Sequence, residues 1–247
     1  MAEPQIKAIV FDSDGTLLDT RRLIIEGYKF VLTAHGLEHL TDEPYIIKRL
    51  GKPVKETYQQ LLAGHHTGLK AEDLAKEHDE VQDTLTQLIK PYTGLTELLH
   101  HWKTMGIKLC IFTSGSRHHI ERNFKAAGIE NVDAIFDAIV TSDDKIERKP
   151  HPDTILELLR RVDVAPHYAM VVGDHMYDAI GGHHARVRLT VGVLHGFGEA
   201  PELIAAGADI LVKDLFALNT IVNLSYDSPF SRLSAIADDK VTDNRPS

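Results

Sequence analysis

Residues 6–16 read Ile-Lys-Ala-Ile-Val-Phe-Asp-Ser-Asp-Gly-Thr, and the class of fold can be inferred from this stretch outward. The short, mostly apolar run at its start contains β-branched residues and predicts a buried strand over 6–11. The Asp and Gly residues that follow are typical of a turn, so the strand ends there. Two carboxylates, Asp12 and Asp14, therefore stand at the carboxyl end of a buried strand.

The second part of the chain alternates strand and helix patterns. Strands are predicted over 107–113, 138–141, 168–172, 189–193 and 209–212, and helices over 95–105, 117–127, 152–162, 176–186 and 200–206. Strands that alternate with ten-residue helices predict an α/β fold with a Rossmann-like parallel sheet. Helices cover both faces of such a sheet, which explains why these strands are continuous apolar runs.

A stretch with only helical patterns separates the first strand from the others. The apolar spacing becomes helical from about Leu17, and four helices are predicted before residue 90 with no strand among them. The simplest explanation is an inserted α-helical cap over the end of the sheet. We therefore predict an α/β core over 1–17 and 92–224, a helical cap over 18–91, and a C-terminal tail or extension over 225–247.

Composition excludes several classes of protein. The 247 residues include 36 Asp and Glu against 27 Lys and Arg, so the net charge is −9 and no basic run is present to bind nucleic acid or an anionic membrane. No apolar stretch approaches the length of a membrane span, and the N-terminus lacks the cationic segment of a signal peptide. The single cysteine, Cys110, is expected to pack as a small hydrophobe in a reducing compartment. These features predict a cytoplasmic protein that binds neither nucleic acid nor membrane.

Four groups of reactive side chains stand at predicted strand ends or in loops. They are Asp12 with Asp14, Thr113 with Ser114, Lys149, and Asp174 with Asp178. Because reactive groups collect at the carboxyl ends of the strands in an open parallel sheet, we expect all four groups to share one site.

The carboxylates suit phosphoryl transfer. One member of the pair Asp12 and Asp14 can attack phosphorus, while the other gives a proton to the leaving oxygen and later takes one from water. Two carboxylates and a phosphate repel one another, so a divalent cation is required. Asp174 and Asp178 add oxygen ligands of the kind that Mg²⁺ prefers.

The remaining two groups supply hydrogen bonds and positive charge. Thr113 and Ser114 can donate to the phosphoryl oxygens, and Lys149 offers a cation. Taken singly, each group has an ordinary explanation, since Asp-x-Asp-Gly is common in turns, Thr-Ser-Gly-Ser caps helices and Lys-Pro is common on surfaces. Their joint occurrence at strand ends and in loops favours a phosphoryl-transfer site.

These motifs together resemble the haloacid dehalogenase (HAD) superfamily, in particular its phosphoglycolate-phosphatase-like and β-phosphoglucomutase-like branch. The resemblance is carried by residues 11–19, 112–117, 149–153 and 172–178, and it extends from residue 6 to about 222. The helical insertion stands where that branch carries its small α-helical (C1) cap. The resemblance therefore implies the same core and cap that the patterns predict.

The resemblance also implies a role for each matching residue. Asp12 is the expected nucleophile, Asp14 the general acid and base, Thr113 the ligand of the phosphoryl group, and Lys149 the stabiliser of charge on both. Mg²⁺ is expected to bind Asp12, the backbone carbonyl of Asp14 and Asp174, with Asp178 binding directly or through water. The second carboxylate, Asp14, favours an oxygen leaving group over dehalogenation.

The implied function is a Mg²⁺-dependent phosphatase that hydrolyses a small phosphorylated metabolite, phosphoglycolate-like or a sugar phosphate, through an aspartyl phosphate. The alternatives are a phosphomutase of the β-phosphoglucomutase type and a catalytically silent HAD-like binding protein. The protein is expected to be a monomer or a homodimer. Lys52, in the cap, is predicted either to pair with an anionic part of the substrate or to be a solvated surface lysine.

The sequence departs from the family pattern at two places near the site. Ser114 stands where many relatives have Asn, and His175 stands where many have Ser or Thr. His175 adjoins the expected metal ligand Asp174 and could touch substrate or phosphate. The chain also has 15 histidines, eight of them in adjacent pairs. Neighbours on a helix point about 100° apart, so the pairs are interpreted as solvated helix faces and not as metal sites.

Overall fold

The computed structural model describes residues 6–227, and its centre is a six-stranded sheet. The strands are β1 (Ala8–Phe11), β4 (Lys108–Phe112), β5 (Ala138–Val140), β6 (Ala169–Gly173), β7 (Leu189–Val193) and β8 (Ile210–Val212). Their order is β5-β4-β1-β6-β7-β8, and every neighbouring pair is parallel. The predicted α/β fold with a parallel sheet is confirmed.

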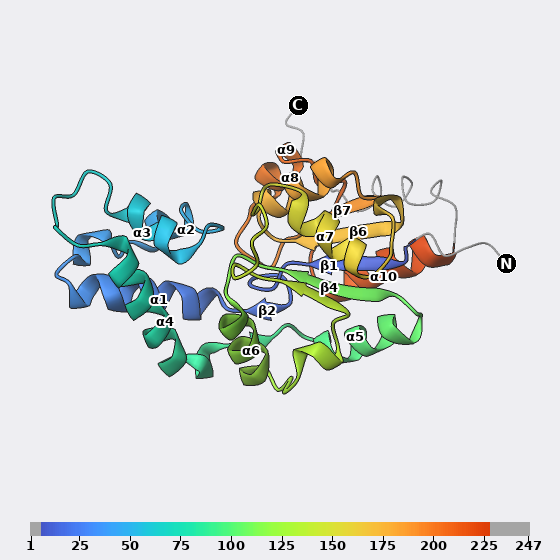
Figure 1. Cartoon of the computed structure of the whole chain (residues 1–247), viewed down its shortest axis with the longest axis horizontal. Helices are drawn as coiled ribbons and strands as arrows, with labels where there is room; N and C mark the ends of the chain where they lie inside the picture. Colours follow the sequence, from blue (N-terminus) through green and yellow to red (C-terminus); the bar gives the residue numbers. More distant parts are fainter. Residues whose placement is uncertain (1–5, 228–247) are drawn as a thin grey trace, which may run out of the picture.

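Helices cover both faces of the sheet (Figure 1), and the side chains of β1 alternate between the two faces. Ala8 and Val10 belong to one apolar cluster, which they share with α7 (Asp153–Arg161). Ile9 and Phe11 point to the other face, because successive residues of a strand alternate in direction. That face is covered by α5 (Leu95–Thr104), α6 (Arg117–Ala126) and α10 (Leu215–Asp227). The remaining helices of the sheet region are α8 (Met176–Ala185) and α9 (Ala200–Ala205).

Helix α10 is an element that the sequence patterns did not predict. Leu218 is fully buried in the larger apolar cluster. Trp102 of α5 stacks on Phe11 and donates a hydrogen bond from Nε1 to Asn219 Oδ1 at 2.8 Å. The predicted tail at 225–247 begins inside this helix, and residues 228–247 lie outside the described residues.

Four helices between the first two strands of the sheet form a group of their own at one end of the molecule (Figure 1). They are α1 (Arg21–Ala34), α2 (Glu43–Ile47), α3 (Val54–Leu61) and α4 (Ala71–Thr84). Their buried side chains form a separate apolar cluster that includes Tyr28 and Tyr58. The predicted division into core and cap stays a prediction, and this separate cluster supports it.

The helical group is joined to the rest of the chain by a short antiparallel pair. Its strands are β2 (Leu18–Asp19) and β3 (Lys90–Pro91), so the chain leaves and returns side by side. The helical pattern expected from Leu17 thus begins only at Arg21 in the structure. Single 3₁₀ turns lie at Glu38–Leu40, Thr86–Leu88, Val132–Ala134 and Pro166–Tyr168.

The strand order determines where a site can form. The chain moves outward from β1 through β4 to β5 on one side, and through β6 and β7 to β8 on the other. Ligands of open α/β sheets bind at such a point of reversal, beyond the carboxyl ends of the strands. Within residues 6–227, no helix is long and apolar enough to cross a bilayer.

Candidate active site

Asp12 lies directly after β1, where it is 8% exposed. Its Oδ1 accepts a hydrogen bond from the ammonium group of Lys149, and that ammonium also lies 2.7 Å from Asp178 Oδ1. The same ammonium is 3.8 Å from the centre of the Phe112 ring, a cation–π contact. The two carboxylates outweigh the effect of burial and raise the pKa of Lys149 above its ordinary value. One buried cation is therefore shared by two carboxylates from separate parts of the chain.

Asp174 and Asp178 form an acidic group with Asp12. One oxygen from each of the three carboxylates lies within 4.8 Å of the others, and all three side chains are buried. Asp174 accepts two hydrogen bonds, from the Thr16 hydroxyl at 2.8 Å and from the backbone N–H of Phe197 at 2.7 Å. Three of the four residues predicted to bind a metal are therefore brought together, and Asp174 is held by two neighbours.

The charge of this group fits a divalent cation. When all three carboxylates are ionised they face one ammonium, and two negative charges are left uncompensated. Burial raises the pKa of Asp12 well above its ordinary range, an effect that Lys149 opposes and that Asp178 and Asp174 reinforce. Burial, and then repulsion from Asp178, raises the pKa of Asp174 to about 7. Carboxylate oxygens are the donors that Mg²⁺ binds, so these residues fit a magnesium ion.

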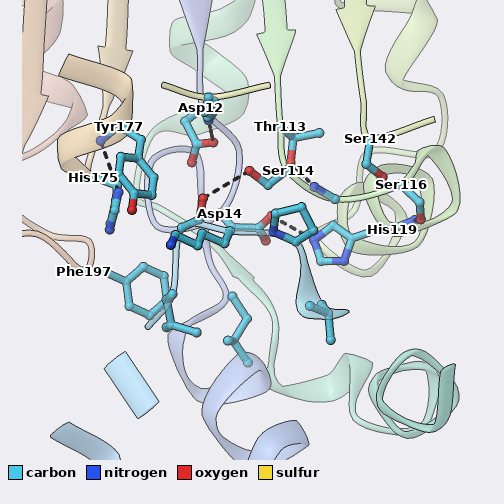
Figure 2. Close-up of a pocket in the computed structure, with 18 of the residues that line it drawn as sticks. Asp12, Asp14, Thr113, Ser114, Ser116, His119, Ser142, His175, Tyr177 and Phe197 are labelled. Carbon is cyan, nitrogen blue, oxygen red and sulfur yellow. Dashed lines mark hydrogen bonds and ion pairs between the residues drawn. The ribbon is translucent and has the colours of Figure 1, made fainter. Parts of the chain in front are cut away.

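Thr113 and Ser114 follow β4, and Figure 2 shows them beside Asp12. The backbone N–H of Gly115 donates to Thr113 Oγ1 at 3.0 Å, so the hydroxyl can donate its own proton to a ligand. Ser114 donates to the backbone oxygen of Gly51 at 3.4 Å, in the helical segment. The two hydroxyls predicted to bind phosphate thus have different surroundings, since Ser114 already contacts residues 18–91.

Asp14 is turned toward α6, and Figure 2 shows its carboxylate directed at His119. Its Oδ2 lies 2.8 Å from His119 Nε2, and its Oδ1 accepts a hydrogen bond from Asn123 Nδ2 at 3.1 Å. Burial raises the pKa of Asp14, but His119 outweighs it, and the pKa lies below its ordinary value. The side chain does not belong to the group of three carboxylates. Its role as a metal ligand through the backbone carbonyl stays a prediction.

The interpretation of the histidine pairs as solvated helix faces is wrong for His119. The side chain of His118 is 66% exposed, whereas that of His119 is 14% exposed and contacts Asp14. The signal that could have found this contact is position, because His119 lies in the first turn of the helix that follows β4. Other paired histidines are exposed as expected: His100, His101, His183 and His184.

A cavity of about 300 Å³, partly open to solvent, lies between the strand ends and the helical segment. Asp12, Asp14 and Thr113 line it from the sheet, and Lys52 and Tyr28 line it from the helices. Lys52 is therefore in place to contact a ligand of this cavity, and its role stays a prediction. The cavity brings a cation from residues 18–91 into the same space as the acidic group.

Gly51 forms a close contact between the helical segment and the sheet end. Its φ is +86°, and a Cβ at this position would come within 2.5 Å of His175 Cε1. His175 also caps α8, because its Nδ1 accepts a hydrogen bond from the backbone N–H of Tyr177 at 3.2 Å. Ser114 and His175, which both depart from the family pattern, thus both contact Gly51.

Comparison with known families gives a match over most of the chain. The model of the haloacid dehalogenase-like hydrolases matches residues 9–192. Among curated proteins, the pyrophosphatase PpaX of Bacillus velezensis is 30% identical over 219 residues, which cover 87% of this chain and 95% of PpaX.

Solved structures agree with this match. A hydrolase from Pseudomonas syringae has a TM-score of 0.77 at 28% identity, covering 89% of this chain and 98% of its own. CbbY from Rhodobacter sphaeroides, in complex with phosphate, has a TM-score of 0.75 at 26% identity, covering 87% of this chain and 99% of CbbY. A mutant of CbbY has also been solved in complex with xylulose-1,5-bisphosphate. The described fold is therefore shared with hydrolases and with a protein that binds phosphate.

Proposed function

Because the chain belongs to the haloacid dehalogenase-like hydrolases, we propose that it is a Mg²⁺-dependent phosphatase that acts through an aspartyl phosphate on Asp12. One observation carries the proposal, namely the convergence of Asp12, Asp174 and Asp178 beside the ammonium of Lys149. A nucleophile, a cation and a set of oxygen ligands are thereby collected at the end of the central strand. Phosphoryl transfer to a carboxylate needs all three.

In the first step, an oxygen of Asp12 attacks phosphorus while the bond from phosphorus to the leaving oxygen breaks. Lys149 stays beside the nucleophile and offsets negative charge on the phosphoryl oxygens. The Thr113 hydroxyl donates a hydrogen bond to one of those oxygens. A magnesium ion held by Asp12, Asp174 and Asp178 would supply the positive charge that lets a phosphate approach three carboxylates.

Asp14 moves the protons in both steps. It gives a proton to the leaving oxygen in the first step, and in the second it takes a proton from the water that attacks the phosphorus. The bond between phosphorus and Asp12 then breaks, and inorganic phosphate is released with the Asp12 carboxylate restored. Both aspartates line the same cavity, which supports this division of work.

The proposed substrate is a small phosphorylated metabolite, phosphoglycolate-like or a sugar phosphate, that carries a second anionic group. The cavity volume is at the lower end of the range for small-molecule sites. Lys52 places a second positive charge in that cavity, in addition to the Lys149 ammonium that pairs with Asp12. Pyrophosphate and xylulose-1,5-bisphosphate, the compounds in the names of the similar proteins, both carry two phosphoryl groups.

The proposal also covers the localisation, the oligomeric state and the binding partners of the protein. We expect a cytoplasmic monomer or homodimer whose partner is the small substrate and not a nucleic acid or a membrane. The charge of −9 on the whole chain supports the second expectation.

Substitution of the proposed nucleophile tests the function. Asp12→Asn is expected to lower hydrolysis of 4-nitrophenyl phosphate by about a thousandfold or more, because an amide cannot form the aspartyl phosphate. Asp73→Asn, at an exposed position of α4, is the matched control and should retain full activity. The measurement is release of nitrophenol and of phosphate with Mg²⁺, and again after chelation.

Three results would contradict the proposal. Activity of Asp12→Asn equal to that of the parent would remove the nucleophile. Full activity after chelation would remove the metal. Phosphate release that requires a bisphosphate activator would point to the phosphomutase instead.

A further inference from the structure

Helix α6 presents three polar side chains to the carboxylate of Asp14 and its surroundings. His119 and Asn123 contact one oxygen each, at 2.8 and 3.1 Å, and Arg122 lies between them in the sequence. Asn123 is fully buried and the side chain of His119 is 14% exposed. One helix therefore engages both oxygens of the residue to which we assign the proton transfers.

The hydrogen-bond partners assign the tautomer of His119. A guanidinium group has only donors, and the NH2 group of Arg122 lies 3.0 Å from His119 Nδ1, so Nδ1 accepts. The Asp14 carboxylate has only acceptors, so Nε2 carries the ring proton and donates it to Asp14 Oδ2 at 2.8 Å. The amide nitrogen of Asn123 also lies 3.0 Å from Nε2, but it donates to Asp14 Oδ1. Arg122 is itself held by the end of α4, through Gln82 Oε1 at 2.8 Å and Asp83 Oδ1 at 3.0 Å. The His119 ring is thus oriented from both sides.

We infer that His119 is a positioning residue, which holds the Asp14 carboxylate in the orientation required for proton transfer to the leaving oxygen and from water. The inference rests on the proposed function, because it assumes that Asp14 moves those protons. Each carboxylate oxygen has two acceptor positions, so the bonds from His119 and Asn123 leave positions available to a ligand. Asp14 and His119 both line the cavity, which places the oriented carboxylate beside the substrate space. His119 exchanges no proton with the substrate in this scheme.

Two substrates with different leaving groups can distinguish a misplaced Asp14 carboxylate from a general loss of structure in a His119 variant. Nitrophenolate is a weak base and leaves with little help from a proton donor. An alkoxide is a strong base and needs a proton from a general acid in order to leave. Hydrolysis of the aspartyl phosphate needs Asp14 with either substrate, since a water must lose its proton. Misplacing Asp14 should therefore slow the first step for an alkyl phosphate only, and the second step for both.

The experiment compares His119→Ala and His119→Gln with the parent, with 4-nitrophenyl phosphate and with an alkyl phosphate. For His119→Ala, we expect kcat/KM for the alkyl phosphate to fall by about tenfold to hundredfold, while kcat/KM for the aryl phosphate changes less than about threefold. Its kcat with the aryl phosphate should fall, with a burst of nitrophenol and an acid-stable phosphoenzyme. His119→Gln should recover part of the loss, because its amide can donate a hydrogen bond to Asp14.

His118→Ala is the matched control, because it removes the neighbouring imidazole, which is exposed and pairs with Asp83 instead of Asp14. It should match the parent with both substrates. The inference would be overturned, with the proposed function left standing, by either of two results for His119→Ala. One is an equal loss of kcat/KM for both substrates with no burst, and the other is no loss of activity. Failure to find an aspartyl phosphate in the parent and in every variant would overturn the proposed function and this inference with it. Melting temperatures of all variants identify any that fail to fold. If His119→Ala fails to fold, His119→Gln takes its place in the comparison. The burst amplitude is then expressed per folded enzyme, so that loss of fold is not counted as loss of positioning.

Discussion

Asp174 shows how one buried residue links metal binding to pH. Burial and the neighbouring Asp178 raise the pKa of its carboxyl to about 7, so below that pH it holds a proton that a metal must displace. We expect the Kd for Mg²⁺ to weaken by about tenfold or more for each pH unit below 7, because the pKa values of Asp174 and of Asp12 are both raised and each proton competes with the metal. Isothermal titration calorimetry between about pH 5.5 and 8 measures this, and a Kd that does not change over the range would refute it.

The same shift has a consequence for stability. In the unfolded chain Asp174 ionises near its ordinary pKa of about 3.9, and in the folded, metal-free chain it ionises near 7. The folded state therefore binds more protons between these values, and the contribution of this group to stability is lost as the pH rises toward 7. Mg²⁺ replaces the proton, so its effect on the melting temperature should be larger at about pH 8 than at about pH 5.5.

At the scale of single residues, the sequence predicted the side chains that follow strands, together with Asp178 in the first turn of α8, but it did not predict the contact that His119 makes from α6. Asp12, Thr113 and Asp174 were found because they end apolar runs, and parallel strands bring such ends together. His119 was not predicted, because the pair pattern does not tell which of two adjacent rings faces the sheet end, and its position in the first turn after β4 was not used. Adjacent histidines have the same pattern whether a ring faces solvent or a buried carboxylate.

Among the elements, α10 is the helix whose contribution to the core can be tested most simply. Leu218 is fully buried in the larger apolar cluster, so Leu218→Ala should lower the free energy of unfolding by about 2–5 kcal/mol. Thr220→Ala, at an exposed position of the same helix, should change it by less than about 0.5 kcal/mol. Chemical denaturation measures both, and equal stability of the two variants would show that α10 does not belong to the core.

The sequence contained the signal for α10 although the prediction missed it. Leu215, Leu218 and Val222 are buried at spacings of three and four residues, which is the pattern of an amphipathic helix. The pair β2 and β3 is a different case, since two residues are too few to form a periodic pattern. The six strands of the sheet were predicted because each is a continuous apolar run, as strands buried on both faces are.

At the scale of the whole molecule, Lys52 tests whether the helical segment selects the substrate. Lys52→Ala should raise KM by about tenfold to hundredfold for a phosphate ester with a second anionic group, the loss of one charge-assisted contact, with little change in kcat. KM for 4-nitrophenyl phosphate should stay the same. Lys48→Ala, at an exposed position of the same segment, is the control. Equal changes in KM for both substrates would place Lys52 outside the specificity contact.

The contact at Gly51 joins the helical segment, which is proposed to bind the substrate, to the two turns that carry the proposed catalytic groups. The residues against Gly51 are Ser114, which adjoins the proposed phosphate ligand Thr113, and His175, which adjoins the carboxylate Asp174. In each of these two turns, the residue against Gly51 is therefore the direct neighbour of a residue with a proposed role, Thr113 in phosphate binding and Asp174 in metal binding. A family member that widened or narrowed its substrate range at this point would shift its own catalytic groups as well, so inherited changes in selectivity and in turnover should arise together.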